Sequence, residues 1–156
     1  MLNDTYLAMK LSNAIESAVK SIKKCQICGA LSENEICEIC LDESRDESKI
    51  CIVENAKDIF ILEENRLFSG KYFVLENLED ESIDRLKTNV KDSVKEIIFA
   101  LTPSLSNDAV ILFIEEKLKE LNIKFTKIAQ GVPTGVHIEN VDMLSLSKAI
   151  NSRVEI

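Results

Sequence analysis

The sequence predicts an α/β protein in which an N-terminal helix and a four-cysteine metal module precede a mostly parallel sheet flanked by helices. Three observations predict this arrangement. Four of the five cysteines form two Cys-x-x-Cys pairs near the N-terminus. Apolar residues recur at helical spacing before these pairs, and short apolar runs alternate with amphipathic segments after them. Because consecutive parallel strands need crossover connections, this alternation favours helices packed on a parallel sheet.

The first element is a helix expected over residues 6–24, a stretch without proline or glycine. Its apolar positions follow the three-and-four spacing of one helical face: Leu7, Leu11, Ala14, Ala18 and Ile22. Lys20, Lys23 and Lys24 are expected on its last turn, where positive charge complements the helix dipole. Contact with the phosphates of DNA is the functional alternative for these lysines.

The metal module follows, with Cys25 and Cys28 as one pair and Cys37 and Cys40 as the other. Two such pairs can hold one zinc ion in tetrahedral geometry at Zn–S distances of about 2.3 Å. Four thiolates close the ligand set, so the site is predicted to hold one structural zinc per chain and to leave no position for an activated water.

The cysteines have other possible interpretations. A thioredoxin-like redox motif needs a single pair that opens a helix after a strand, and iron could also bind four sulfurs. Disulfides would suit a secreted domain. The chain starts without an apolar signal segment and has an odd fifth cysteine, which favours a reducing cytoplasm. The fifth cysteine, Cys51, lies in an apolar run and is predicted to be a small core residue.

The rest of the chain predicts the sheet and its helices. Residues 41–49 are rich in charge and are expected to be a solvated connector. Apolar or β-rich runs predict strands over residues 50–53, 71–75, 96–101 and 124–129. Helices are expected over residues 56–64, 79–90, 107–121 and 144–152, the third capped by Asn107 or Asp108. A loop is expected at residues 131–135.

Composition limits the functional classes. The 156 residues are 46% hydrophobic, and no apolar run is long enough to span a membrane. Lysine and arginine number 19 against 27 acidic residues, a formal charge of −8. This charge repels a polyanion at long range. Binding to nucleic acid would therefore depend on a local basic patch or on the geometry of an oligomer.

Two acids are expected at the carboxyl ends of the strands, where open α/β sheets bind ligands. Glu54 ends the first strand, and Asp108 follows the third. Together they could hold magnesium for phosphoryl chemistry. The alternative is that Glu54 begins a turn and Asp108 caps a helix. This alternative is favoured because no third carboxylate lies between residues 100 and 107. His137 has no nucleophile partner in the sequence and is expected in a loop.

Five motifs occur in order along the chain: Cys25-x-x-Cys28-Gly29, Cys37-x-x-Cys40, Ile50-Cys51-Ile52-Val53-Glu54, the run at residues 68–75, and the run at residues 128–135. Together they give the chain a resemblance to the RecR family of bacterial recombination mediators. The resemblance implies a zinc module, a Toprim domain and a C-terminal segment related to a Walker B motif. It implies four regions: residues 1–24, 25–49, 50–130 and 131–156.

The resemblance also implies a function. RecR-like proteins are non-enzymatic and form ring-shaped dimers or tetramers around DNA. They work with RecO and RecF to load RecA on single strands in recombinational repair. The four cysteines match the zinc ligands of the family, and Glu54 and Asp108 match acids implicated in docking RecO. Enzymatic Toprim domains have Asp-x-Asp where this chain has Thr102-Pro103-Ser104.

Departures from the family pattern set further expectations. No glycine precedes Gly29, so these residues are not expected to build a helix-hairpin-helix module, and residues 1–24 would be its remnant. Duplex binding is therefore expected to be weak, and a dimer is expected rather than a tetramer. Gly135-Val136 stands where the family has two glycines. Two rival functions remain: a magnesium-dependent Toprim nuclease or phosphotransferase, and a zinc-stabilised protein-interaction domain.

Overall fold

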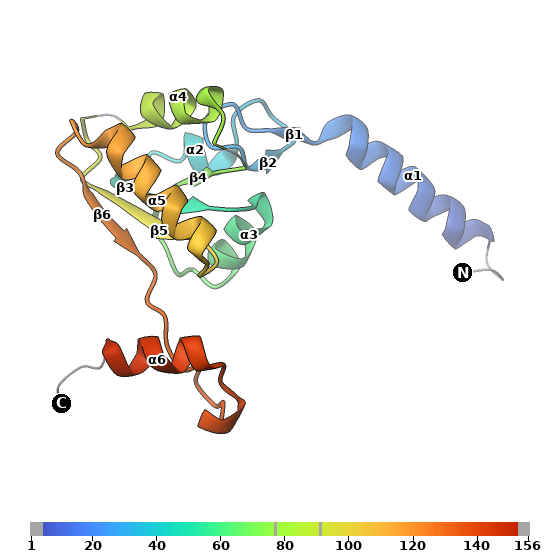
Figure 1. Ribbon diagram of the computed structural model, residues 1–156. Helices are drawn as coiled ribbons and strands as arrows, with labels where there is room; N and C mark the ends of the chain where they lie inside the picture. The colour runs from blue at the N-terminus through green and yellow to red at the C-terminus, as the bar shows by residue number, and fades with distance from the viewer. Residues whose placement is uncertain (1–4, 77, 91, 153–156) are drawn as a thin grey trace.

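The computed structural model describes residues 5–76, 78–90 and 92–152 and divides the chain into a body and two arms (Figure 1). The body begins with the small hairpin β1 (Lys23–Lys24) and β2 (Leu31–Ser32) and the short helix α2 (Glu38–Leu41). The sheet and its helices follow in the order β3 (Asp46–Val53), α3 (Ala56–Glu64), β4 (Gly70–Val74), α4 (Asp80–Asn89), β5 (Glu96–Ala100), α5 (Leu105–Leu118) and β6 (Lys124–Lys127). The arms are α1 (Thr5–Ser21) and a C-terminal segment with η1 (Ile138–Asn140) and α6 (Met143–Asn151).

The sheet has four strands in the order β4-β3-β5-β6, and every neighbouring pair is parallel. β3 is central: Val53 lies opposite Val74 of β4 and opposite Ala100 of β5. The carboxyl ends of β3, β4 and β5 therefore lie at the same end of the sheet, which we call the carboxyl edge. The predicted α/β fold with a parallel sheet is confirmed.

The two faces of the sheet are buried by different parts of the chain. Side chains alternate along a strand, so Ile50 and Ile52 face one side while Cys51 and Val53 face the other. The first face packs against α4 and α5 through Ile83, Leu86, Ile114 and Leu118. The second face packs against α3 and the metal module through Ile59, Cys25, Cys28, Ala30 and Cys37. The metal module thus forms part of the layer that covers the sheet.

Some element boundaries differ from the sequence prediction. α1 ends at Ser21 rather than at residue 24, because Lys23 and Lys24 pair with β2. Residues 46–49, predicted to belong to a solvated connector, are the first part of β3, where Lys49 pairs with Glu96 of β5. α5 begins at Leu105, and its cap is Ser104, whose hydroxyl accepts a bond from the Asn107 amide, rather than Asn107 or Asp108.

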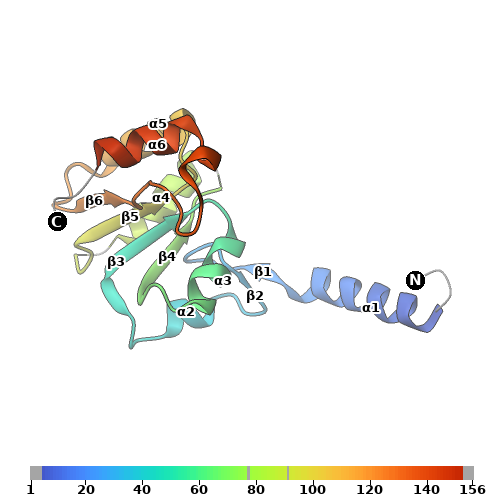
Figure 2. The ribbon, with the colours of Figure 1, turned by 90° about the horizontal axis from the view of Figure 1, so that it is seen from below.

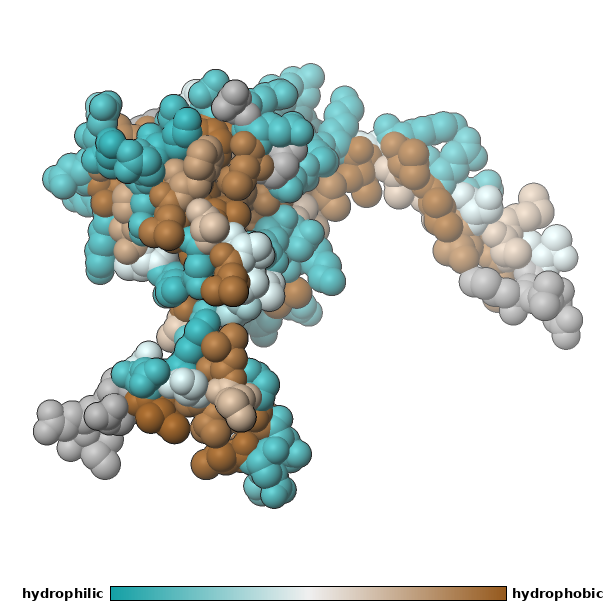
Figure 3. Space-filling view, viewed as in Figure 1, coloured by the Kyte–Doolittle hydropathy of each residue, from teal (hydrophilic) through white to brown (hydrophobic). Residues whose placement is uncertain are grey.

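The two arms bury none of their helical residues. α1 projects away from the sheet in both views (Figure 1 and Figure 2). The metal module therefore does not hold α1 against the sheet. α6 also has no buried residue, and apolar side chains lie along α1 and α6 on the visible surface (Figure 3). No helix in the described ranges combines the length and hydrophobicity that crossing a membrane needs.

Candidate zinc centre and partner-binding edge

The four predicted ligands come together in one cluster. Their sulfur atoms all lie within 4.8 Å of one another, and this is the only metal-competent group of three or more side chains in the described part of the chain. The Cys25 and Cys40 sulfurs are 3.9 Å apart, and the Cys28 and Cys37 sulfurs are 3.5 Å apart. Zn–S bonds of about 2.3 Å in a tetrahedron give sulfur separations of about 3.8 Å. The cluster therefore fits zinc.

The backbone around the cluster supports the sulfurs. The Ala30 amide donates to the Cys28 sulfur over 3.4 Å, and the Cys37 amide donates to the Cys25 sulfur over 3.3 Å. Gly29 turns the chain after the first pair with φ +80°, a conformation that favours glycine. Such N–H···S bonds favour thiolate over thiol, since they stabilise negative charge on sulfur.

Crowding makes the four sulfurs unequal as acids when no cation balances them. The hydrogen bond with Cys28 lowers the pKa of Cys37, while the same contact raises the pKa of Cys28. The pKa of Cys40 is also raised, chiefly by its contact with Cys28. Four thiolates this close need a positive charge among them, which is what a zinc ion supplies.

Backbone and side-chain hydrogen bonds dock the module onto the sheet. The Val74 amide of β4 donates to the Cys28 carbonyl over 2.7 Å, and the Asn89 side chain of α4 donates to the Ile27 carbonyl over 2.6 Å. The Lys71 ammonium of β4 donates to three carbonyls at the end of α2, those of Ile39, Cys40 and Asp42. The first cysteine pair and α2 are thus tied to the sheet or its helix α4.

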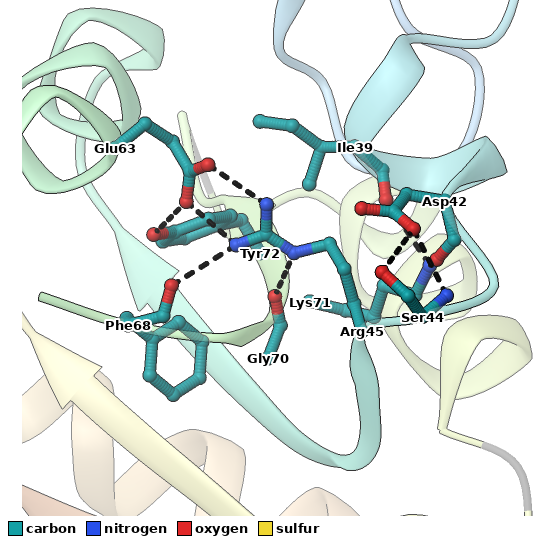
Figure 4. Close-up of polar contacts among 9 residues, drawn as sticks. All are labelled: Ile39, Asp42, Ser44, Arg45, Glu63, Phe68, Gly70, Lys71 and Tyr72. Atoms are coloured by element: carbon teal, nitrogen blue, oxygen red, sulfur yellow. Dashed lines mark hydrogen bonds and ion pairs between the residues drawn. The ribbon is translucent and has the colours of Figure 1, made fainter. Parts of the chain in front are cut away.

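A second group of hydrogen bonds to the sheet surrounds Arg45, and we call it the Arg45 clasp (Figure 4). Its guanidinium makes two bonds to the Glu63 carboxylate, at 2.8 and 2.6 Å, and others to the carbonyls of Phe68 and Gly70. The Tyr72 hydroxyl donates to Glu63 over 2.6 Å. The bond from Arg45 lowers the pKa of Glu63. The contacts of Arg45 were not predicted, because Arg45 lies among the residues expected to be a solvated connector.

Glu54 lies where it was predicted, directly after β3 at the carboxyl edge of the sheet. Both of its carboxylate oxygens accept hydrogen bonds from the segment after β5. The Thr102 amide and hydroxyl donate over 3.2 and 2.8 Å, and the Asn107 side-chain amide donates to the same carboxylate. Glu54 and Asn107 also line a cavity of about 320 Å³, with Leu75, Glu76, Leu101 and Val110 among its other walls. Thr102 and Asn107 were not predicted as its partners.

Asp108 is the next residue along α5, but it has a different partner. Its carboxylate forms an ion pair of 3.2 Å with Lys127 of β6, and it lines a separate cavity beside Phe99 and Phe125. The structure therefore brings both predicted acids to the carboxyl side of the sheet and gives each its own contacts. His137 is exposed in the loop before η1, as predicted.

The predicted basic residues at the N-terminal side do not share one helical turn. Lys20 lies on α1 and pairs with Glu16, whereas Lys24 lies on β1 and pairs with Glu76 over 2.6 Å. Lys23 is an exposed residue of β1. All three are at the solvent-exposed junction between α1 and the body.

This architecture, a four-cysteine module packed on a parallel α/β sheet, is that of a zinc-finger and Toprim protein. Residues 22–42 match the family model for the zinc finger domain of RecR, which has four cysteines, and residues 48–129 match the model for the Toprim domain.

Curated relatives agree over nearly the whole chain. Recombination protein RecR from a Nitratiruptor species is 57% identical over 150 residues, 96% of this chain and 79% of the relative. Recombination protein RecR of Campylobacter jejuni subsp. doylei is 53% identical over 99% of this chain and 82% of the relative. That of Helicobacter pylori (strain Shi470) is 50% identical over 99% and 80%. The chain belongs to the RecR family, and its role is in DNA recombination and repair.

Proposed function

We propose that the chain is a non-enzymatic recombination mediator that docks RecO at the carboxyl edge of its sheet, works with RecF, and so helps to load RecA on single-stranded DNA. The main support for this proposal is the set of hydrogen bonds that the Glu54 carboxylate accepts. Its carboxylate is half-buried and held by three donors from the segment after β5. A carboxylate engaged in this way presents a fixed negative charge for recognition and has few lone pairs left to coordinate a metal for catalysis.

In this proposal, Asp108 adds a second negative charge near Glu54. Its side chain is 45% exposed and within reach of an incoming basic group, even though Lys127 neutralises part of its charge. A partner that presents lysine or arginine would compete with Lys127 for Asp108 and would meet Glu54 and Glu76 in the neighbouring cavity.

Binding to purified RecO tests the proposed docking site. We expect Glu54→Ala and Asp108→Ala to weaken RecO binding by about tenfold or more, since a hydrogen bond to a charged group contributes roughly 1.5–3 kcal/mol. Glu116→Ala is the matched control, because Glu116 is an exposed acid on α5 that pairs with its helix neighbour Lys119. Equal affinity of all three variants would contradict the docking site.

The proposed role of Cys25, Cys28, Cys37 and Cys40 is to hold one structural zinc ion per chain. The ion would supply the positive charge that four neighbouring thiolates need, and the residues themselves bind it, orient the hairpin and exclude water from the cluster. Elemental analysis of the purified chain should give about one zinc per chain. The free cysteines suit a reducing compartment, so we place the chain in the cytoplasm.

DNA contact is proposed to be weak and electrostatic, with Lys20, Lys23 and Lys24 as its main contributors. Two of these lysines already pair with acids, and the chain has a formal charge of −8. We expect undetectable duplex binding in a mobility-shift assay at physiological salt and weak binding that rises as salt is lowered. Tight binding at physiological salt would contradict this part of the proposal.

We further propose that the chain forms a dimer. The support is the apolar surface of the two arms, whose helices bury no residue within the single chain. Exposed apolar faces of this kind are typical of surfaces that bind another chain. Light scattering should give the mass of two chains, and a monomer at micromolar concentration would contradict the proposal.

A further inference from the structure

Asn107 joins three separate parts of the carboxyl edge. Its amide nitrogen donates to the Glu54 carboxylate after β3 and to the Thr102 carbonyl over 2.8 Å. Its own backbone amide donates to the Ser104 hydroxyl that caps α5. Asn107 therefore connects the end of β3, the segment after β5 and the first turn of α5.

The chemistry of its partners fixes how the Asn107 amide is turned. The Glu54 oxygen and the Thr102 carbonyl are both acceptors, so both must face the NH₂ group of the amide. The reversed amide would place its oxygen against these two acceptors. A leucine in this position would lack both donors, and an aspartate would bring a second negative charge to Glu54. Among residues of this size, asparagine satisfies both partners.

We propose that Asn107 is a positioning residue: it holds the Glu54 carboxylate in one orientation against Thr102 and thereby fixes the segment between β5 and α5 in the shape that a partner protein binds. This inference rests on the proposed function in naming a protein partner for the edge. The arrangement of Glu54, Thr102 and Asn107 is called the edge clasp below.

Three features make the edge clasp a means of holding the segment. Thr102 binds Glu54 through both its amide and its hydroxyl, so rotation of the carboxylate would break more than one bond. Pro103 follows and restricts Thr102 to extended backbone. Asn107 is in the first turn of α5, so its bond to Glu54 brings the carboxylate near the helix N-terminus, which favours negative charge. Removing the Asn107 side chain would leave the Glu54 oxygen and the Thr102 carbonyl short of a donor.

Amide hydrogen exchange of Thr102 measures the edge clasp directly, because that amide donates to Glu54. We expect Asn107→Ala to speed exchange of the Thr102 amide by about tenfold or more, since local protection reflects the stability of the local hydrogen bonds. Ser106→Ala is the matched control, because Ser106 is an exposed neighbour on the same turn and its hydroxyl bonds to Ser104. It should leave exchange unchanged. Asn107→Asp should also speed exchange, by repulsion from Glu54.

The RecO-binding assay then connects the edge clasp to recognition. Asn107→Ala is expected to weaken binding by about as much as Glu54→Ala, and the double variant by no more than either alone, because one unit is lost in each case. Additive losses would mean that Asn107 acts independently of Glu54 and would overturn the inference. Millimolar magnesium should leave Thr102 exchange unchanged in the wild-type chain, since the donors already occupy the carboxylate.

Failure of the inference differs from failure of the proposed function. If Thr102 exchange is the same in Asn107→Ala as in the wild type, the edge clasp is wrong, whatever RecO does. If exchange speeds up but no variant at the edge changes RecO affinity, the edge clasp exists but does not position a RecO site, which overturns the stated role of Asn107 together with the docking proposal.

Discussion

The body and the arms of this molecule both carry many apolar residues but use them differently. In the body, both faces of the sheet are covered, and Ile52, Val53 and Phe73 are fully buried. On α1, Ile15 and Val19 are 56% and 78% exposed, and on α6 Met143 is 86% exposed. The stability of the single chain therefore comes from the body, and the apolar residues of the arms contribute little to it.

Polar side chains, and not only apolar packing, hold the body together. The Lys71 ammonium and the Arg45 clasp both tie residues near the metal module to β4. The ion pair in the last turn of α1, Lys20 with Glu16, is by contrast internal to the helix. The metal module is therefore bound to the sheet and not to the helix that precedes it.

Removal of zinc should have the largest effect on the body. We expect Cys37→Ser to lose the metal and to unfold the module, because structural zinc contributes on the order of 10 kcal/mol of binding free energy to such small folds. Elemental analysis and amide exchange over residues 23–42 provide the measurement. Cys51→Ala is the control, since Cys51 is a buried cysteine outside the ligand cluster and should leave zinc content unchanged. A zinc-loaded Cys37→Ser chain would contradict the ligand set.

The Arg45 clasp should give the next largest effect. Arg45→Met is expected to lower the free energy of unfolding by about 3 kcal/mol, because Glu63 would be left without its main partner and two carbonyls would lose donors. Urea denaturation measures this. Lys49→Met is the control: its ion pair with Asp46 is only partly buried, and pairs near the surface contribute about 0–1 kcal/mol. If the two variants are equally stable, the clasp does not hold the body together.

Acid should weaken the Arg45 clasp as well. The pKa of Glu63 lies below its ordinary value of 4.5 in the folded chain, because Arg45 binds the ionised form. The stabilisation by Glu63 is therefore complete above about pH 4.5 and is lost as pH falls through the lower folded pKa. Thermal melting between about pH 6 and about pH 3 should show a smaller drop for Glu63→Gln than for the wild type. Parallel curves would show that Glu63 is not linked to stability.

Single apolar substitutions also distinguish the body from the arms, and the smallest effect of all is expected on α1. Ile59→Ala, which shortens a residue 1% exposed under the metal module, should lower the free energy of unfolding by about 3 kcal/mol. Ile15→Ser on α1 should change the same quantity in the monomer by no more than about 0.5 kcal/mol, since Ile15 is already exposed. Urea denaturation measures both. A large loss for Ile15→Ser under monomeric conditions would mean that α1 packs on the body.

The sequence predicted the elements whose pattern is local. Helix α3 begins and ends at the predicted residues, and all four strands of the sheet were found. The cysteine cluster was predicted from spacing alone because Cys-x-x-Cys pairs restrict where two sulfurs can lie. Cys51 is a core residue, as its apolar neighbours indicated.

The contacts that depend on distant residues were not predicted. Charge at residues 41–49 indicated a solvated segment, but Arg45 forms hydrogen bonds to Glu63 and to Gly70 of β4. In addition, β3 starts within the same stretch. The pairing of Lys24 with β2 ended α1 early, which helical spacing cannot reveal. The partners of Glu54 were missed as well, although Ser104 and Asn107 have the spacing of a helix N-cap and its third residue, a signal that indicates where α5 begins.

Amide exchange of the whole chain, with and without RecO, is the decisive measurement for the docking site. RecO should protect the carboxyl edge of the sheet, at residues 54–55, 74–76 and 101–110, and leave α1 and α6 unchanged. Protection confined to α1 or α6, with no change at that edge, would contradict it.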